Sequence, residues 1–405
     1  MNKPPAFPFA EGPRLTPPVE YHSIHARAEL PEVCLRGGQQ ALLVCRHADV
    51  RTVLGHQAFS RQAFAAGSLF ARAAESLALM QTDPPVHSRR RGVVAPLFTA
   101  RRAEQQRPKL EALAGKLIAD IRTGAPVVDL LSEFCVPFTM GVISDMLGVP
   151  EADRCQFRPW VNLMMSAFGH PKEDVAAAHA EMQDYFTDLV DSTWAAVKAG
   201  SGVSGLIADL GRLSDDERDM TREETIVMSS GLLIAGYEST SNQLGSFVYL
   251  LLSERQRWEF LLECPDAINS AIEELLRWTA VTTTGGAPHV ATEDVELSTT
   301  TVRAGQTVVP LTHTANWDPE VFGAPERLDL TRADNPHVAF GYGRHRCLGA
   351  ELARAELRVA LACLLRELPE LTLSVPESEL NWRSGMQVSG LWELPVRWTS
   401  TEAGR

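Results

Sequence analysis

The segment Phe340-Gly-Tyr-Gly-Arg-His-Arg-Cys-Leu-Gly349 is the most informative stretch of this 405-residue chain. Its two glycines at spacing two permit a tight turn and a close approach of the backbone to a flat group. Cys347 stands just before a helical pattern over about 350–368, and the N–H groups at a helix start stabilise a thiolate. Such a thiolate, beside the basic residues 344–346, suits a soft metal ion with anionic groups around it. The alternative is an ordinary glycine-rich turn that contains a buried cysteine.

This segment matches Phe-Gly-x-Gly-x-His-x-Cys-x-Gly and thereby resembles the haem-binding signature of the bacterial cytochrome P450 family. The resemblance implies that Cys347 is the thiolate ligand of the iron of haem b (iron protoporphyrin IX). Thiolate ligation favours cleavage of the O–O bond. The resemblance also implies that His345 holds a haem propionate and that Phe340 shields the sulfur. The other residues of the segment that we expect at the cofactor are Gly341, Arg344 and Gly349.

The composition indicates a globular protein with a large core. Apolar residues make up 45% and charged residues 22% of the chain, and the net charge is −13. This acidic balance argues against a general nucleic-acid-binding role. The first thirty residues contain no apolar run long enough for a signal peptide or a membrane anchor, so we expect a cytoplasmic protein without membrane association. Seven scattered cysteines without a C-x-x-C pair argue against a disulfide framework or a structural zinc site.

Helical periodicity dominates the chain, and short strand patterns occur near both ends. The clearest helical patterns cover 47–54, 222–252 and 267–278. The strand patterns cover 41–45, 287–297, 301–309, 371–375 and 391–398. A loop-like segment occupies about 59–79. Together with the resemblance, this indicates a mainly α protein with the cytochrome P450 fold, small sheets near the N- and C-terminal parts, and one domain over 1–405 that begins with a Pro-rich extension of about twenty residues.

Glu274 and Arg277 have the spacing of two side chains on one helix face. Such pairs are common on solvated surfaces. The resemblance implies instead a buried structural network, which an arginine from a later Pro-x-Arg stretch completes. In this chain that arginine is Arg327.

Residues 83–91 resemble the helix that covers one haem edge in the family. His87 and Arg91 are four residues apart and therefore share a helix face, where they could hold a propionate. Relatives usually carry a further arginine in the strand after the Glu-x-x-Arg helix. This chain has His289 there, and a neutral imidazole holds a carboxylate less firmly than a guanidinium does.

The long helix carries Ala235 and Gly236, followed by Glu238, Ser239 and Thr240. The resemblance implies that the small residue and the glycine loosen this helix over the haem. It also implies that an acid–alcohol pair delivers protons for dioxygen cleavage, a step that needs proton donors in a water-poor site. Glu238 matches the acid, and Ser239 stands where relatives have threonine. The alternative for both hydroxyls is a bond back to a helix carbonyl, which we prefer for Thr240.

Electrons must come from a partner, because the chain has neither a flavin-binding region nor iron–sulfur cysteine spacing. Residues 89–109 hold seven basic side chains against one acid, Glu104. We expect an acidic ferredoxin, served by a ferredoxin reductase, to dock there with salt-sensitive kinetics.

The resemblance places the substrate pocket among the 59–79 loop, the 160–185 helices, the long helix, the strand after Arg277 and the C-terminal hairpin. The residues from these regions that we expect at substrate are Phe64, Phe70, Met80, Trp160, Met164, Phe168, Ile234, Val281, Gly286, Met386, Gln387 and Val388. Such a lining is apolar, aromatic and sulfur-rich, which suits a neutral molecule. The small, polar segment 281–286 favours a substrate carbonyl or amide.

The sequence therefore predicts a P450 monooxygenase that oxidises an aromatic or peptide-derived natural product with O2 and two electrons. One alternative keeps the haem chemistry but ends in oxidative C–C or C–N coupling, for example of a tryptophan-containing cyclic dipeptide. Product mass separates the two, because hydroxylation adds one oxygen atom whereas coupling removes hydrogens. A remote alternative is a non-catalytic haem-binding sensor or recruitment module.

Overall fold

The computed structural model describes residues 4–9, 15–17, 20–25, 29–35, 37–66, 79–166, 170–213, 220–282 and 284–398. The chain forms two compact units, each with buried apolar residues of its own. Unit 1 comprises Met1–Ala74, Met80–Asp83 and Cys264–Ala350. Unit 2 comprises Glu75–Leu79, Pro84–Glu263 and Glu351–Arg405.

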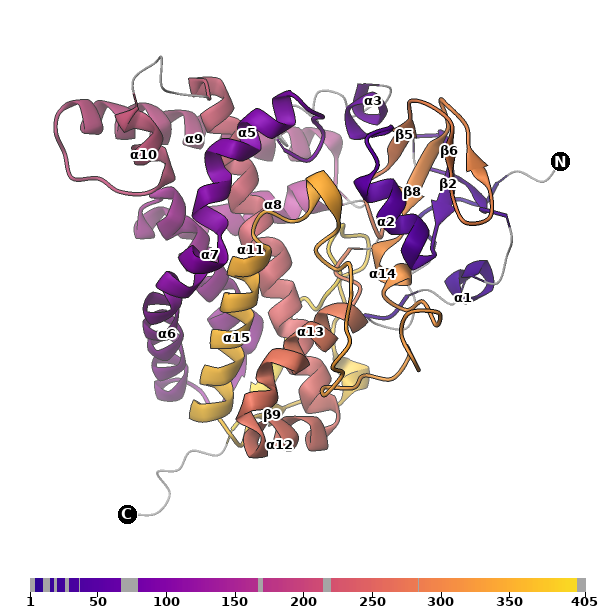
Figure 1. Cartoon of the computed structure of the whole chain (residues 1–405). Coiled ribbons are helices and arrows are strands. Elements are labelled where there is room, and N and C mark those ends of the chain that lie inside the picture. The colour runs from indigo at the N-terminus through magenta and orange to yellow at the C-terminus, as the bar shows by residue number, and fades with distance from the viewer. Residues whose placement is uncertain are drawn as a thin grey trace. The chain divides into compact units, whose positions relative to one another are not determined.

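Unit 1 is built on a five-stranded sheet of order β1-β2-β8-β5-β3. Its strands are β1 (Glu32–Cys34), β2 (Gln40–Val44), β3 (Phe59–Ser60), β5 (His289–Ala291) and β8 (Thr307–Pro310). All neighbours pair antiparallel except β2 and β8, which are parallel with Leu42 opposite Val308. Figure 1 shows the indigo N-terminal strands beside the orange ones. The sheet therefore joins segments that lie far apart in the sequence.

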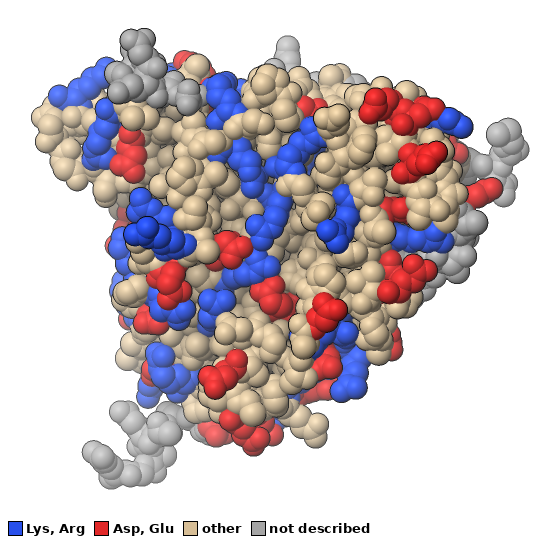
Figure 2. Space-filling view, viewed as in Figure 1, with Lys and Arg blue, Asp and Glu red and all other residues tan. Residues whose placement is uncertain are grey.

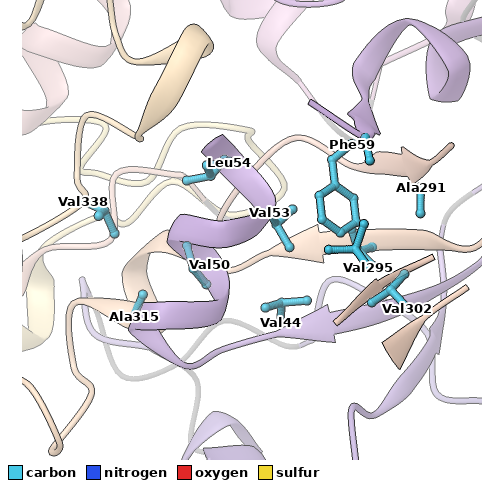
Figure 3. Close-up of a cluster of buried hydrophobic side chains, with 12 residues drawn as sticks. Val44, Val50, Val53, Leu54, Phe59, Ala291, Val295, Val302, Ala315 and Val338 are labelled. Atoms are coloured by element: carbon cyan, nitrogen blue, oxygen red, sulfur yellow. The ribbon is translucent and has the colours of Figure 1, made fainter. Parts of the chain in front are cut away.

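Helix α2 (His47–Gly55) packs on this sheet through an apolar face. Val50, Val53 and Leu54 lie in one buried cluster with strand residues such as Val44 (Figure 3). Burial of one such side chain contributes roughly 1.5–3 kcal/mol. This packing fixes the C-terminal end of α2, on which the cysteine loop rests.

The remaining elements of unit 1 are short apart from one helix. They are α1 (Glu20–His25), α3 (Arg61–Ala66), α13 (Ile268–Trp278), α14 (Thr312–Ala315) and the strand pair β6 (Val295–Glu296) and β7 (Thr301–Val302). Helix α13 buries one face and carries the Glu-x-x-Arg pair on it.

Unit 2 is mainly helical. Its helices are α5 (Val86–Val94), α6 (Ala100–Thr123), α7 (Val136–Leu147), α8 (Phe157–Met165), α9 (Lys172–Lys198), α10 (Leu206–Arg212), α11 (Arg222–Ser253), α12 (Arg255–Glu263) and nearly all of α15 (Ala350–Glu367). A small sheet of order β4-β10-β9 completes the unit, with β4 (Val127–Asp129), β9 (Thr372–Leu373) and β10 (Pro395–Arg397).

Helix α11 runs through the core of unit 2 and packs against α7 and α9 (Figure 1). A capping box begins it: the Glu224 N–H donates to the Thr221 hydroxyl at 3.1 Å, and the Thr221 N–H donates to the Glu224 carboxylate at 3.0 Å. Most of its side chains from Thr225 to Leu252 are buried on all sides. The helical pattern that the sequence shows over 222–252 is confirmed.

The mainly helical architecture with small sheets near both ends agrees with the sequence prediction. The segment expected as a loop from residue 59 differs, because β3 pairs there with β5 and leads into α3. Residues 67–78 lie outside the described part of the chain. In the described ranges, no helix is long and apolar enough to cross a bilayer.

Candidate active site

The cysteine loop in unit 1 is a tight turn that presents its thiol. The Cys347 N–H donates to the Phe340 carbonyl at 2.7 Å, and the Arg346 N–H donates to the Gly343 carbonyl at 3.0 Å. Gly341 and Gly343 have φ of +70° and +68°, a region that glycine adopts readily. Cys347 is exposed, so the alternative of a buried structural cysteine is wrong.

The loop rests on the end of α2. A Cβ at Gly343 would come within 2.5 Å of the Leu54 carbonyl oxygen, so only glycine fits this close approach. Arg344 adds a hydrogen bond of 2.9 Å from Nη2 to the His56 carbonyl. An exposed thiol on a rigid loop, just ahead of a helix, is the donor that a thiolate-ligated haem iron requires. The residues present therefore fit the cofactor.

A cluster of polar and charged side chains lies around His289 in unit 1. Arg61 Nε donates to His289 Nε2 at 3.1 Å. Burial, reinforced by the positive charge of Arg61, lowers the pKa of His289 to about 3. The neutral ring accepts at Nε2, which assigns its proton to Nδ1. Burial also lowers the pKa of Arg61, against the charge of Asp83, to about 10, so Arg61 remains charged at neutral pH.

Sequence reasoning missed Arg61. The sequence feature that could have indicated Arg61 is the absence of the usual arginine at position 289. A carboxylate site without that arginine needs a cation from another element. No local pattern connects Arg61 to His289, since 228 residues separate them.

Asp83 and His345 complete this cluster. His345 Nε2 lies 3.8 Å from Asp83 Oδ1, and the Ser60 hydroxyl donates to the other carboxylate oxygen. Burial raises the pKa of Asp83, but the interactions with His345 and Ser60 outweigh it and hold that pKa below its usual range. The cluster thus already stabilises one carboxylate, which is the chemistry that a haem propionate needs.

The middle of α11 in unit 2 has one accessible spot. Ala235 is exposed, although its neighbours Leu233 and Ile234 are buried. A Cβ at Gly236 would come within 2.7 Å of Ile143 on α7, which explains the glycine. An exposed methyl group on an otherwise buried helix is a surface that a flat group can approach, so this element also fits haem.

The predicted relay residues Glu238, Ser239 and Thr240 follow Ala235 on α11, and their surroundings differ. Ser239 Oγ donates to the Ala235 carbonyl at 2.8 Å, which is the helix bond considered as its alternative. The hydroxyl keeps its lone pairs as acceptors, so the bond leaves a relay role open. Thr240 is buried. Glu238 is buried and forms an ion pair of 2.7 Å with Arg383, a residue that sequence reasoning missed.

Helix α5 in unit 2 carries the other residues expected at a propionate. His87 is buried and Arg91 is half-buried, four positions apart on the helix. Arg89 Nη1 and Arg90 Nε donate to the Glu224 carboxylate at 2.9 and 3.0 Å. These two arginines therefore stabilise the start of α11.

Comparison with known proteins decides the family. The model of the family described as cytochrome P450 matches residues 267–384. Nocardicin C N-oxygenase of Nocardia uniformis subsp. tsuyamanensis is 38% identical over 398 residues, which cover 97% of this chain and 98% of that protein. The chain belongs to the cytochrome P450 family. It is an oxidoreductase of the monooxygenase type, and its fold is the P450 fold.

Two further relatives agree over the full length of this P450. Mycinamicin IV hydroxylase/epoxidase of Micromonospora griseorubida is 37% identical over 98% of this chain and 99% of its own length. The crystal structure of HinD with NMFT and NO has a TM-score of 0.91 and 40% identity, and the match covers 98% of this chain and 100% of that one.

The Glu-x-x-Arg pair of this P450 lies in a buried network within unit 1. Glu274 and Arg277 are both fully buried and joined by hydrogen bonds of 2.7 and 2.8 Å. The third arginine is a correction. Arg332 Nε contacts Glu274 at 2.9 Å, whereas the predicted Arg327 supplies its main-chain carbonyl to Arg277 and exposes its side chain. The Pro-x-Arg stretch thus lies at the network, but its arginine side chain points away.

The residues expected at substrate occur in both units. In unit 1, Phe64, Val281 and Gly286 are half-buried and Met80 is exposed. In unit 2, the buried ones are Met164, Ile234, Met386 and Val388, while Trp160 is half-buried and Gln387 exposed. Phe70 and Phe168 lie outside the described residues.

The structure joins two of the predicted pocket segments of unit 2. The Gln387 N–H donates to the Met165 carbonyl at 2.9 Å, and Met386 forms a β-bridge with Ser166. Trp160 directs its indole N–H to Glu181 at 2.6 Å. The C-terminal hairpin tip therefore lies against the end of α8.

Proposed function

We propose that this P450 binds haem b through Cys347 and inserts oxygen into a neutral, aromatic or peptide-derived natural product. The observation that carries the proposal is the exposed Cys347 thiol on its glycine-shaped loop. The names of two relatives support oxygenation as the type of reaction, since one is a nocardicin C N-oxygenase and the other a mycinamicin IV hydroxylase/epoxidase.

Five residues would hold the propionates of the cofactor. Arg61 and His289 act as one unit, in which the imidazole orients the charged guanidinium. His345 adds a donor beside them, and His87 and Arg91 on α5 provide the remaining donors. Bound haem supplies activation of dioxygen by a thiolate-ligated iron. The pair of Arg61 and His289 takes the place of the single arginine that relatives have.

Glu238 and Ser239 would move the protons that dioxygen cleavage consumes. Ser239 lies one turn after the exposed Ala235, and its hydroxyl is fixed in orientation by its bond to that carbonyl. To relay a proton, this hydroxyl would accept one at a lone pair and release its own, which requires it to turn away from the Ala235 carbonyl. Thr240 is buried and stays a weaker candidate for this role.

A ferredoxin, reduced by its reductase, would supply the electrons. Figure 2 shows Lys and Arg side chains, with some acids among them, over α5 and α6. Arg89 and Arg90 pair with Glu224, and Arg107 pairs with Glu104 at 2.6 Å. The exposed basic residues of α6 that remain for an acidic partner are Arg101, Arg102 and Lys109. The docking surface is therefore smaller than the sequence count indicates, and reduction should slow as salt rises.

The test is an optical titration of the ferric holoprotein with neutral aromatic metabolites, cyclic dipeptides, steroids and macrolides. A ligand that shifts the iron to high spin identifies the substrate class. Turnover of that ligand should then add one oxygen atom to the product mass. Loss of two hydrogens without added oxygen would replace monooxygenation by oxidative coupling, and NADH use that no ligand stimulates would favour the non-catalytic alternative.

A further inference from the structure

Arg383 connects the relay acid of α11 to the C-terminal hairpin within unit 2. Its Nη1 lies 2.7 Å from Glu238 Oε1 and donates to Asn242 Oδ1 at 2.8 Å. Both members of the ion pair are buried, with 4% and 5% of their side-chain surface exposed. The Asn242 amide donates to the Glu238 carbonyl at 2.7 Å, so these three residues form a closed set of contacts.

Arg383 belongs to the C-terminal hairpin, which spans residues 382–391 and has its tip at 386–388. Its N–H donates to the Gly390 carbonyl at 3.0 Å, and the neighbouring residues Trp382 and Leu391 form a β-bridge. The Arg383 guanidinium lies over the ring of Trp392, 4.8 Å from the centroid. Backbone pairing and the aromatic face therefore hold Arg383 from both strands of the hairpin.

The hairpin packs closely on α11. A Cβ at Gly390 would come within 2.5 Å of Asn242 Oδ1, so a glycine lets the hairpin backbone reach the helix. At its far end, the hairpin tip bonds to the end of α8 through Gln387 and Met165. A displacement of the tip is thus transmitted along a short, buried path to the residue that holds Glu238.

We propose that Arg383 is a positioning residue that couples the hairpin tip to the Glu238 carboxylate. The proposal rests on the proposed function, in which Glu238 carries protons, and on the sequence prediction that residues 386–388 meet substrate. When a substrate keeps the tip in its place against α8, Arg383 holds the carboxylate in one place on α11. When the tip moves away, the ion pair weakens and Glu238 loses its fixed position. Proton delivery is thereby matched to an occupied pocket.

The decisive measurement is hydrogen exchange of the hairpin amides in the haem-loaded protein. Glu238→Gln changes a residue far away in sequence, yet it should speed exchange at Gln387 about tenfold or more, which corresponds to about 1.4 kcal/mol. Arg383→Met should speed exchange at least as much, and the double variant should add little to Arg383→Met, because both changes remove the same ion pair. Gly390→Ala should loosen the tip without removing a charge. Arg397→Met, an exposed arginine on β10, is the matched control and should leave exchange unchanged.

A second measurement separates positioning from simple anchoring. In Arg383→Met the amount of oxygenated product formed per NADH consumed should fall at least fivefold, and hydrogen peroxide should form instead. The spectrum of the reduced carbon monoxide complex should stay that of the wild type. Arg383→Lys keeps the charge and should restore part of the product formed per NADH.

The outcomes distinguish this inference from the proposed function. Unchanged exchange in Glu238→Gln, or additive effects in the double variant, would overturn the coupling even if the wild type hydroxylates its substrate. Faster exchange with an unchanged amount of product per NADH would reduce Arg383 to an anchor and also overturn it. If the wild type forms no oxygenated product at all, the proposed function fails, and the exchange pattern still decides whether Arg383 links the tip to Glu238.

Discussion

Removal of the Arg277 guanidinium should destabilise unit 1 by about 3–5 kcal/mol, the cost of breaking a fully buried ion pair from one side. Arg277 makes five hydrogen bonds: two to Glu274 and three to the carbonyls of Asn316, Pro325 and Arg327. In Arg277→Met the three carbonyls lose this donor, and each buried acceptor left unmet costs about 1–3 kcal/mol. Arg332 and Asn335 still reach the Glu274 carboxylate, which limits the loss.

This loss is large against a total stability of about 5–15 kcal/mol. Urea unfolding of the haem-loaded protein measures it, with circular dichroism and haem absorbance recorded separately because the two compact units need not unfold together. Arg277→Lys offers one nitrogen in place of three and should recover only part of the loss. The control is Arg332→Met, whose partner contacts are partly exposed and whose cost should stay near 1–2 kcal/mol. Equal costs for Arg277→Met and Arg332→Met would refute the reasoning.

Three further changes probe the cysteine loop and the start of α11. Gly343→Ala forces a Cβ against the Leu54 carbonyl at a φ of +68° and should cost at least about 2 kcal/mol and weaken haem retention, measured by transfer of haem to apomyoglobin. Cys347→Ser should abolish the thiolate-type spectrum of the reduced carbon monoxide complex; its persistence would remove Cys347 as the ligand. Hydrogen bonds from Arg89, against the opposing effect of burial, lower the pKa of Glu224 from 4.5 to about 2. Its contribution to stability should therefore be complete above about pH 4.5 and disappear as the pH falls to about 2, and Glu224→Gln should flatten that part of the acid-unfolding curve.

The sequence predicts those elements that depend on residues close together in the chain. The helical pattern over 222–252, the strand pattern over 41–45 and the turn before Cys347 each depend on neighbours within a few residues, and the structure has all three. Side-chain contacts between distant segments carry no such signal. Arg61 reaches His289 because β3 pairs with β5, and that pairing follows from the assembled sheet.

In the Glu274 network, the sequence likewise predicts the segment but not the side-chain contact. The motif located the right stretch of chain, since Arg327 lies beside Arg277. Which arginine turns inward depends on the path of the backbone over the next few residues, and that path directs Arg332 to the carboxylate. The ion pair between Glu238 and Arg383 likewise arises from a hairpin that folds back onto α11.

The parallel pairing of β2 with β8 sets an order of events during synthesis on the ribosome. Strand β2 is complete at Val44, but its partner begins at Thr307, after the whole helical stretch from 84 to 263 has been made. At roughly 5–20 residues per second, the nascent N-terminal strands wait about 13–50 seconds for that partner. During this interval β2 presents an unpaired edge to other nascent chains. The yield of folded enzyme should therefore depend on chaperones that shield the first sixty residues until strand β8 is available for pairing.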